Sequence, residues 1–227
     1  MKKLLSGIVD FRQTRRKEYK EMFKKLSIGQ NPDCLYLTCC DSRVVANVFA
    51  STNPGDLFVV RNVGNLVPPA TRQGFSSGDV SQSAALEFAL QSLNVSSVII
   101  CGHSECGAMM ALHQGREKVT AEHFRQWLEH GDEALNRLNE HRLSFIPEPN
   151  TADYNVLSQE NVLLQIEHLK TFPFIAERIS SGKLTVHAWW FEIANVNVYA
   201  FDDRERRFRI IEGTWAQELL DRVPPSS

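Results

Sequence analysis

Leu35-Tyr-Leu-Thr-Cys-Cys-Asp-Ser-Arg43 is an apolar run that stops at two cysteines and is followed by a carboxylate, a hydroxyl and a guanidinium. Such a run is typical of a buried strand with polar residues where the strand ends. Ser97-Val-Ile-Ile-Cys-Gly102 repeats the pattern later in the chain and leads into His103-Ser-Glu-Cys106. We therefore expect two strand ends to present cysteine and histidine side chains to one place.

Cys39, His103 and Cys106 form the ligand set that this arrangement offers to a metal ion. In an open parallel sheet, ligands collect at the carboxyl ends of neighbouring strands. Two thiolates and one imidazole suit zinc, and three protein ligands leave the fourth position open for water or substrate, as in catalytic sites. Cys40 should point away from Cys39 because successive side chains of a strand alternate. Asp41 returns to the face of Cys39, either as a fourth ligand or as a neighbour of the metal.

A plainer interpretation treats the cysteines as packing residues. Single buried cysteines commonly behave as small apolar side chains, and we apply that interpretation to Cys34, Cys40 and Cys101, whose surroundings in the sequence are apolar. For Cys39 and Cys106 it is disfavoured, because two cysteines and a histidine at strand ends together satisfy the requirements of zinc.

The same residues carry a family resemblance. Cys39-Cys-Asp-Ser-Arg43 resembles the Cys-x-Asp-Ser-Arg motif of β-class carbonic anhydrases, and Gly102-His-Ser-Glu-Cys-Gly107 resembles the His-x-x-Cys segment of that family. The similarity extends from about residue 28 to residue 215. Because both motifs occur in order and with this spacing, the resemblance is specific. It implies a zinc enzyme in which hydroxide on the metal hydrates carbon dioxide reversibly to bicarbonate and a proton.

The resemblance assigns Asp41 and Arg43 to a catalytic pair. A carboxylate that accepts a hydrogen bond from the hydroxide on zinc determines which lone pair faces the substrate. Arg43 would keep Asp41 ionised and away from the metal. In some family members the aspartate itself ligates zinc at low pH, and a surface ion pair is the plainer alternative; both remain open at the level of sequence.

Matching family positions also imply an apolar pocket for carbon dioxide. Its wall would consist of Phe58, Val63 and Phe88, and the amide of Gln30 and the backbone N–H of Gly102 would be nearby donors. Phe88 stands where plant-type members carry tyrosine, so a hydroxyl is absent from that position.

Some family members bind bicarbonate in an inhibitory side pocket made of a tryptophan, a tyrosine and an arginine. The equivalent positions here are Tyr36, Phe191 and Arg61. Because two of the three residue types differ, we do not expect that form of inhibition.

Composition narrows the class of partner. The chain of 227 residues has 27 acidic and 25 basic residues and a net charge of −2. It therefore lacks the excess of positive charge that is typical of proteins that bind nucleic acid or a membrane surface. The apolar patch at the amino terminus is interrupted at Asp10, so no signal-peptide core is expected, and no run is long enough for a membrane helix. The odd number of cysteines favours a reducing compartment, with the cytoplasm as the default.

Hydrophobic periodicity predicts alternating strands and helices. An amphipathic helix over 4–26, with Gly7 as the place for a break, would form an N-terminal arm (1–27) ahead of a zinc domain (28–227). The expected strands are 34–39, 57–61, 98–101, 184–191 and 196–201, and the expected helices are 44–50, 79–93 capped by Asp79, 120–141 and 155–170. These lengths predict an α/β fold with a mainly parallel sheet flanked by helices.

The sequence thus predicts a cytoplasmic β-class carbonic anhydrase with Zn²⁺ as cofactor and carbon dioxide and bicarbonate as small-molecule partners. By resemblance it would be a homodimer or a dimer of dimers, with the arm packed on a neighbouring subunit and Gln30 reaching that subunit's site. Two thiolates make zinc a weak Lewis acid, so activity should rise toward alkaline pH. The alternatives are a carbon disulfide or carbonyl sulfide hydrolase on the same fold, and a non-catalytic zinc-stabilised scaffold, which would not need Asp41 and Arg43.

Overall fold

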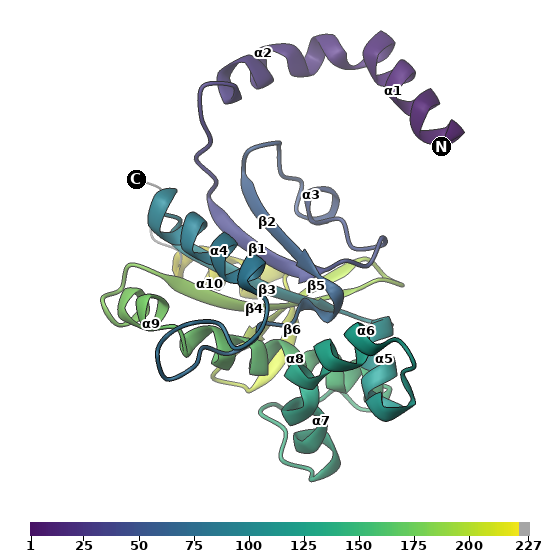
Figure 1. Cartoon of the computed structure of the whole chain (residues 1–227). Coiled ribbons are helices and arrows are strands. Elements are labelled where there is room, and N and C mark those ends of the chain that lie inside the picture. The colour runs from purple at the N-terminus through teal and green to yellow at the C-terminus, as the bar shows by residue number, and fades with distance from the viewer. Residues whose placement is uncertain (223–227) are drawn as a thin grey trace.

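The computed structural model describes residues 1–222 and contains one six-stranded sheet with the strand order β2-β1-β3-β4-β5-β6 (Figure 1). The strands are β1 (Cys34–Cys39), β2 (Leu57–Asn62), β3 (Ser97–His103), β4 (Thr185–Glu192), β5 (Asn197–Asp202) and β6 (Arg207–Ile210). The first four run parallel, and β5 and β6 are antiparallel additions. The expected mainly parallel sheet with flanking helices is therefore confirmed. β6 has no counterpart among the expected strands, because four residues are too few to show a clear alternation.

β1 is the strand around which the sheet is built. All six of its residues are buried, as expected for a parallel strand covered on both faces. Leu35 and Leu37 belong to the main apolar core, whereas Cys34 and Tyr36 belong to a smaller cluster that includes Phe191. The alternation of side chains thus distributes one continuous apolar run over the two faces of the sheet.

The strand register places the ends of β1 and β3 at the same edge of the sheet. Thr38 is paired with Cys101, and Cys39 follows as the last residue of β1. β3 extends to His103, two residues beyond the expected end, so His103 is the final residue of that strand. The two predicted ligands therefore come from neighbouring strand ends, where ligands collect in open α/β sheets.

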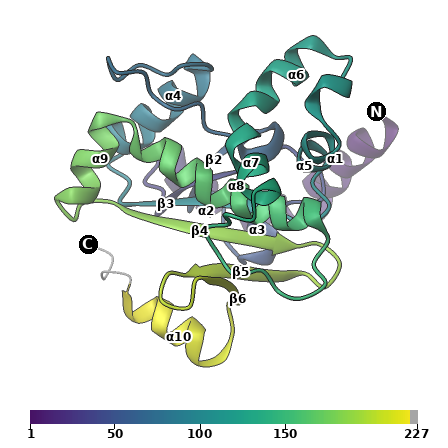
Figure 2. The same cartoon turned by 90° about the horizontal axis from the view of Figure 1, so that it is seen from below.

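The longest helix, α8 (Asp153–Lys170), packs along β3 and β4. Gly102 permits this approach, because a Cβ atom at its position would lie 2.6 Å from a methyl carbon of Val162. The other helices of the main body are α3 (Ala46–Phe49), α4 (Val80–Glu87), α5 (Gly107–His113), α6 (Glu122–Trp127), α7 (Asp132–Asn139), α9 (Pro173–Ser180) and α10 (Gly213–Arg222). Figure 2 shows α10 beside β5 and β6 at the edge of the sheet. Helices α5, α9 and α10 have no counterpart among the expected elements.

Two of the expected helices differ in detail. The cap at Asp79 is confirmed, since its Oδ1 accepts a hydrogen bond from the backbone N–H of Ser81 at 2.8 Å. The regular helix ends at Glu87 and continues as a π-helical turn, Phe88–Ser92. The stretch 120–141 contains α6 and α7 with a 3-10 turn between them. No helix among residues 1–222 is both long enough and apolar enough to cross a bilayer.

The amino-terminal arm consists of α1 (Lys2–Thr14) and α2 (Arg16–Leu26), which extend away from the sheet (Figure 1). The expectation of a break near Gly7 is wrong, because the break is at Arg15. A glycine inside an exposed helix costs only about 1 kcal/mol relative to alanine and leaves the hydrogen bonds in place. At Arg15 the backbone φ is −109°, far from the helical value of about −63°. Neither arm helix buries a side chain.

Candidate metal centre

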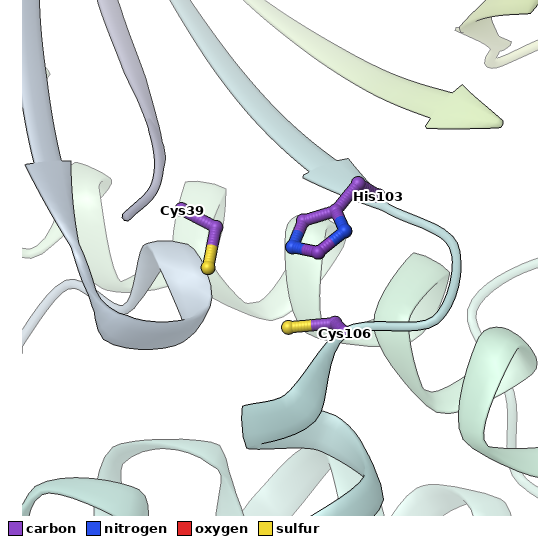
Figure 3. Close-up of side chains that lie close together, drawn as sticks. All are labelled: Cys39, His103 and Cys106. Carbon is purple, nitrogen blue, oxygen red and sulfur yellow. The ribbon is translucent and has the colours of Figure 1, made fainter. Parts of the chain in front are cut away.

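The structure brings together the three residues that the sequence offers as metal ligands. Cys39 ends β1, His103 ends β3, and Cys106 precedes α5. Their ligand atoms all lie within 4.8 Å of one another, and all three residues are buried. Figure 3 shows the two sulfur atoms and the imidazole ring turned toward the same space.

The hydrogen bonding of His103 determines which of its nitrogens is free. Nδ1 lies 2.8 Å from the carbonyl oxygen of Ser104, and because a carbonyl only accepts, Nδ1 must carry the proton. Nε2 then has a lone pair, and it is buried without a hydrogen-bond partner among the described residues. An orphaned lone pair facing two sulfur atoms fits a bound zinc ion, since metal-ligating histidines use their other N–H in this way.

The backbone of His103 is tied to α8 by a chain of hydrogen bonds. The Ser158 hydroxyl donates to the His103 carbonyl at 2.8 Å and accepts from the indole N–H of Trp190 at 3.1 Å. The sequence alone does not reveal this role of Trp190, because a hydrogen bond between a strand and a distant helix has no signature in local sequence.

The two thiols shift each other's pKa in opposite directions. The hydrogen bond from Cys106 lowers the pKa of Cys39 to about 4, and the backbone N–H of Gly64, 3.3 Å from its Sγ, acts in the same direction. The same hydrogen bond, together with burial, raises the pKa of Cys106 well above its usual value. One thiolate is therefore present near neutral pH, and a metal ion would displace the remaining proton.

Asp41 and Arg43 form a two-pronged ion pair beside this group. The Arg43 side chain donates to Asp41 through Nε at 2.9 Å and through Nη2 at 2.7 Å, and Nη2 also donates to the Glu105 carbonyl at 3.0 Å. This pairing holds the pKa of Asp41 well below its usual range. Asp41 Oδ2 lies 4.0 Å from His103 Nε2, so an ionised carboxylate borders the site.

Arg61 holds the segment that carries Cys39 and Asp41. Its guanidinium donates to the Cys39 carbonyl at 2.9 Å and to the carbonyl of Val44. Tyr36 and Phe191, the other two positions compared with the inhibitory pocket, pack against aromatic rings. Tyr36 is buried with its ring edge-on to Trp189, and the ring of Phe191 stacks on Phe49 with 4.4 Å between centroids. The sequence analysis considered Arg61 only as part of a possible inhibitory pocket. It did not predict that Arg61 holds the segment after β1 through these hydrogen bonds.

The positions predicted for the substrate wall are separated in the single chain. Val63 is next to Gly64, the contact of Cys39, and its carbonyl accepts a hydrogen bond from Trp127 Nε1 at 2.7 Å. Phe58 pairs with Leu35 at the opposite end of β1, four residues or about 13 Å from Cys39.

Gly102, inside β3, is buried under α8, whereas Gln30 is exposed between the arm and β1. Phe88 is 45% exposed, with its ring centroid 5.9 Å from that of Phe58. The chain therefore does not assemble Gln30, Phe58 and Phe88 around its own Cys39.

Comparisons with known proteins all match the chain to one enzyme family. A family profile described as carbonic anhydrase matches residues 34–198. The carbonic anhydrase of Synechococcus elongatus is 36% identical over 201 residues, which cover 87% of this chain and 70% of the relative. The carbonic anhydrase of Pseudomonas aeruginosa is 32% identical over 210 residues, covering 92% of this chain and 90% of the relative.

Solved structures resemble the chain over most of its length. The β-carbonic anhydrase CcaA superposes with a TM-score of 0.83 at 32% identity, covering 92% of this chain and 98% of that one. A β-carbonic anhydrase of Sordaria macrospora, described as tetrameric, gives a TM-score of 0.72 at 28% identity, with 87% and 94% covered.

Proposed function

Because the chain belongs to the β class of the carbonic anhydrase family, whose members are carbonate dehydratases, we propose that it catalyses the reversible hydration of carbon dioxide to bicarbonate and a proton. The observation that supports this most directly is the Cys39, His103 and Cys106 group with an ionised carboxylate at its border. Three ligands leave an open position, as in catalytic rather than structural zinc sites.

Zinc is the metal that this donor set fits best. Held by these side chains, it would supply a Lewis acid that makes water acidic enough to attack carbon dioxide. The two thiolates donate charge and weaken that effect, so the activity should rise toward alkaline pH, above about pH 7.

Asp41 and Arg43 have separate tasks in this proposal. Asp41 remains ionised and accepts a hydrogen bond from the attacking water, which orients an oxygen lone pair toward the substrate. Arg43 occupies both carboxylate oxygens and so keeps Asp41 at the border of the metal group. The Glu105 carbonyl orients Arg43 in turn.

We further propose that a complete site needs a second copy of the chain, as a homodimer or a dimer of dimers. Gln30, Phe58 and Phe88 are not gathered at the chain's own metal group, and a partner could supply them. Apolar side chains of the arm support this arrangement, because Leu4 is 67% exposed and Ile8 64% exposed. Burial of these apolar side chains against a neighbouring subunit would stabilise the assembly.

The proposed location is the cytoplasm. All five cysteines lie within the described residues and none forms a disulfide. Free thiols and a site that needs thiolates both suit a reducing compartment. The near-balanced charge of −2 supports a small molecule and a second copy of the chain as partners, rather than nucleic acid.

Stopped-flow measurement of carbon dioxide hydration by the zinc-loaded protein tests this function, with carbonyl sulfide hydrolysis followed in parallel. We expect hydration to dominate. Asp41→Asn should retain zinc and lose about 10- to 100-fold in turnover, whereas Asp203→Asn, the same change at an exposed turn, should have no effect. Faster hydrolysis of carbonyl sulfide would favour the hydrolase alternative, and zinc retention without either activity would favour a scaffold.

A further inference from the structure

A short segment after β2 contacts one of the predicted metal ligands. The backbone N–H of Gly64 donates a hydrogen bond to Cys39 Sγ at 3.3 Å, and this contact is buried. Gly64 lies in a 3-10 turn, Val63–Asn65, that packs against β1, β3 and α5. A thiolate that accepts a hydrogen bond has less charge to donate to a metal, so the placement of this one peptide group affects the metal centre.

The peptide group that donates to Cys39 is held from its other side by a tryptophan. The carbonyl of Val63 and the N–H of Gly64 belong to the same trans peptide group, so they point in opposite directions. Trp127, the last residue of α6, donates from its indole Nε1 to the Val63 carbonyl at 2.7 Å, at the short end of the range for such bonds. One chain of hydrogen bonds therefore runs from the indole through the peptide group to the sulfur of Cys39.

The two hydrogen bonds of this peptide group strengthen each other. A peptide group that accepts a hydrogen bond at its carbonyl becomes a better donor at its N–H, because both bonds polarise the group in the same direction. The N–H of Gly64 is thus a stronger donor to Cys39 while Trp127 is bonded to the Val63 carbonyl.

Gly64 has a backbone conformation that needs support from outside the turn. Its φ is +79°, in the left-handed region, and a Cβ atom at its position would lie 3.0 Å from the Cβ of Ala108 and 3.3 Å from the Cε of Met109. Glycine suits this position, but it also leaves the neighbouring peptide groups the most freedom to rotate. Hydrogen bonds from other elements therefore determine the direction of the Gly64 N–H.

Helix α8 supplies the rest of this support. Asn161 Nδ2 donates to the Gly64 carbonyl at 3.1 Å, and Asn161 Oδ1 accepts from Gln165 Nε2 at 2.9 Å. Gln165 Oε1 accepts from the backbone N–H of Val67 at 2.7 Å, and both side chains are fully buried. Asn161 and Gln165 thus hold the later part of the segment, whereas Trp127 holds the peptide group that faces Cys39.

Packing alone does not require the indole N–H of Trp127. The side chain packs against the apolar cluster that includes Cys39 and Cys106, and its ring lies edge-on to that of His130 with 5.4 Å between centroids. A phenylalanine would also provide an apolar ring, whereas the bond to the Val63 carbonyl needs the N–H.

We propose that Trp127 is a positioning residue of the metal centre. Through the Val63–Gly64 peptide group it holds Cys39 Sγ in place and lowers the charge that this sulfur donates to a bound metal. The inference rests on the proposed zinc site, since Cys39 is one of its ligands. It adds α6 to the elements that support the centre.

Cobalt(II) in place of zinc gives a test that does not depend on catalysis. Cobalt accepts the same donor atoms, and its sulfur-to-metal charge-transfer band moves to longer wavelength as the thiolate becomes richer in charge. Trp127→Phe keeps an aromatic ring and removes the N–H, so we expect this shift together with about tenfold weaker cobalt binding in competition with a chelator. Trp189→Phe, the same change in the cluster on the other face of the sheet, should alter neither.

A second probe separates the N–H from the shape of the ring. Benzothienylalanine at position 127 keeps two fused rings and has sulfur in place of the N–H, so it tests the bond even if Trp127→Phe does not fold. The same spectral shift is expected. A spectrum and a cobalt affinity equal to those of the unmodified protein would show that Trp127 only packs, and would overturn the inference. In a protein that hydrates carbon dioxide, that result would leave the proposed function intact, whereas a protein that bound neither cobalt nor zinc would overturn both.

Discussion

His103 shows how a single residue can be prepared for a metal before the metal binds. Its Nδ1 is committed to the carbonyl of Ser104, so the unprotonated Nε2 faces Cys39 and Cys106. The neighbouring Cys106 lowers the pKa of Cys39, which favours the thiolate that a metal ion requires. The orienting hydrogen bonds thus reduce the reorganisation that metal binding requires.

Replacing one ligand should empty the site. Cys106→Ser is expected to reduce zinc from one ion per chain to a small fraction, because two remaining ligands seldom retain zinc. Elemental analysis after gel filtration provides the measurement. Cys40→Ser is a matched control, since Cys40 is adjacent to Cys39 but exposed. Full zinc content in Cys106→Ser would refute the ligand assignment.

At the scale of elements, side chains from neighbouring segments hold the loops that carry the chemistry. Arg61 at the end of β2 holds the carbonyls of the segment after β1, and Ser158 of α8 holds the carbonyl of His103 at the end of β3. Ion pairs also join α7 to α8, where Arg137 contacts the buried Glu160 and the half-exposed Glu167. These bonds link the active-site loops to the rigid sheet and to the longest helix.

Arg61→Met should loosen the segment that carries Cys39 and Asp41. Loss of a charged donor to several carbonyls is expected to lower both turnover and zinc affinity about tenfold, similar to the effect of other groups that orient metal ligands. Steady-state kinetics and competition with a chelator measure the two effects. Arg204→Met, in the exposed turn before β6, is the control. Kinetics and zinc affinity equal to those of the unmodified protein would show that Arg61 does not position Cys39 and Asp41.

Arg137→Met should destabilise the fold without changing the site. Glu160 is fully buried, so loss of its charged partner is expected to lower the free energy of unfolding by about 3 kcal/mol. Urea unfolding at pH 7 measures this change. Arg142→Met, which breaks an exposed pair with Glu140, should cost less than about 1 kcal/mol.

The second ion pair of Arg137, with Glu167, predicts a dependence on pH. Arg137 lowers the pKa of Glu167, so this stabilisation is complete above the ordinary carboxyl pKa of about 4.3 and is lost as the pH falls through the lower pKa of the folded state. The difference between Arg137→Met and the unmodified protein should therefore shrink below about pH 4. A difference that stayed constant down to pH 3 would show that packing, rather than charge, supplies the stability.

At the scale of the whole molecule, the exposed arm and the separation of the predicted substrate residues both support the proposed homodimer. The arm helices extend from the sheet and bury no side chain of their own (Figure 1). Phe58 lies at the end of β1 opposite to Cys39. A second copy is the simplest partner that would cover the arm and complete the site.

Mixing two damaged chains tests this directly. Gln30→Ala should lower turnover and Cys39→Ala should remove zinc, so each variant alone has little activity. In a shared site, a mixed dimer regains one intact centre, with zinc ligands from the first chain and Gln30 from the second. Activity should therefore rise on mixing, to about a quarter of the unmodified level if subunits exchange at random in a dimer.

Subunit exchange needs its own control, for which differently tagged chains can be purified together. Gln114→Ala with Cys39→Ala is the matched mixture, because Gln114 is an exposed glutamine after α5 and its variant should already be active alone. Proven exchange without recovery of activity would mean that Gln30 does not act across the interface.

The sequence by itself determined the parallel strands and the composition of the metal group. Cys39, His103, Cys106 and Asp41 could be recognised because each follows a short apolar run, and strand ends in an α/β sheet converge on one edge. The helix start at Asp79 was predictable because its cap is local. Such features depend on neighbours in the chain.

Only the tertiary structure decided the rest. Three contacts join residues far apart in the chain: the pairing of β1 with β3, the hydrogen bonds of Arg61 to the Cys39 segment, and the hydrogen bond of Trp190 to Ser158. Local patterns do not determine these features, because their energies arise from contacts that form only when the whole chain has packed.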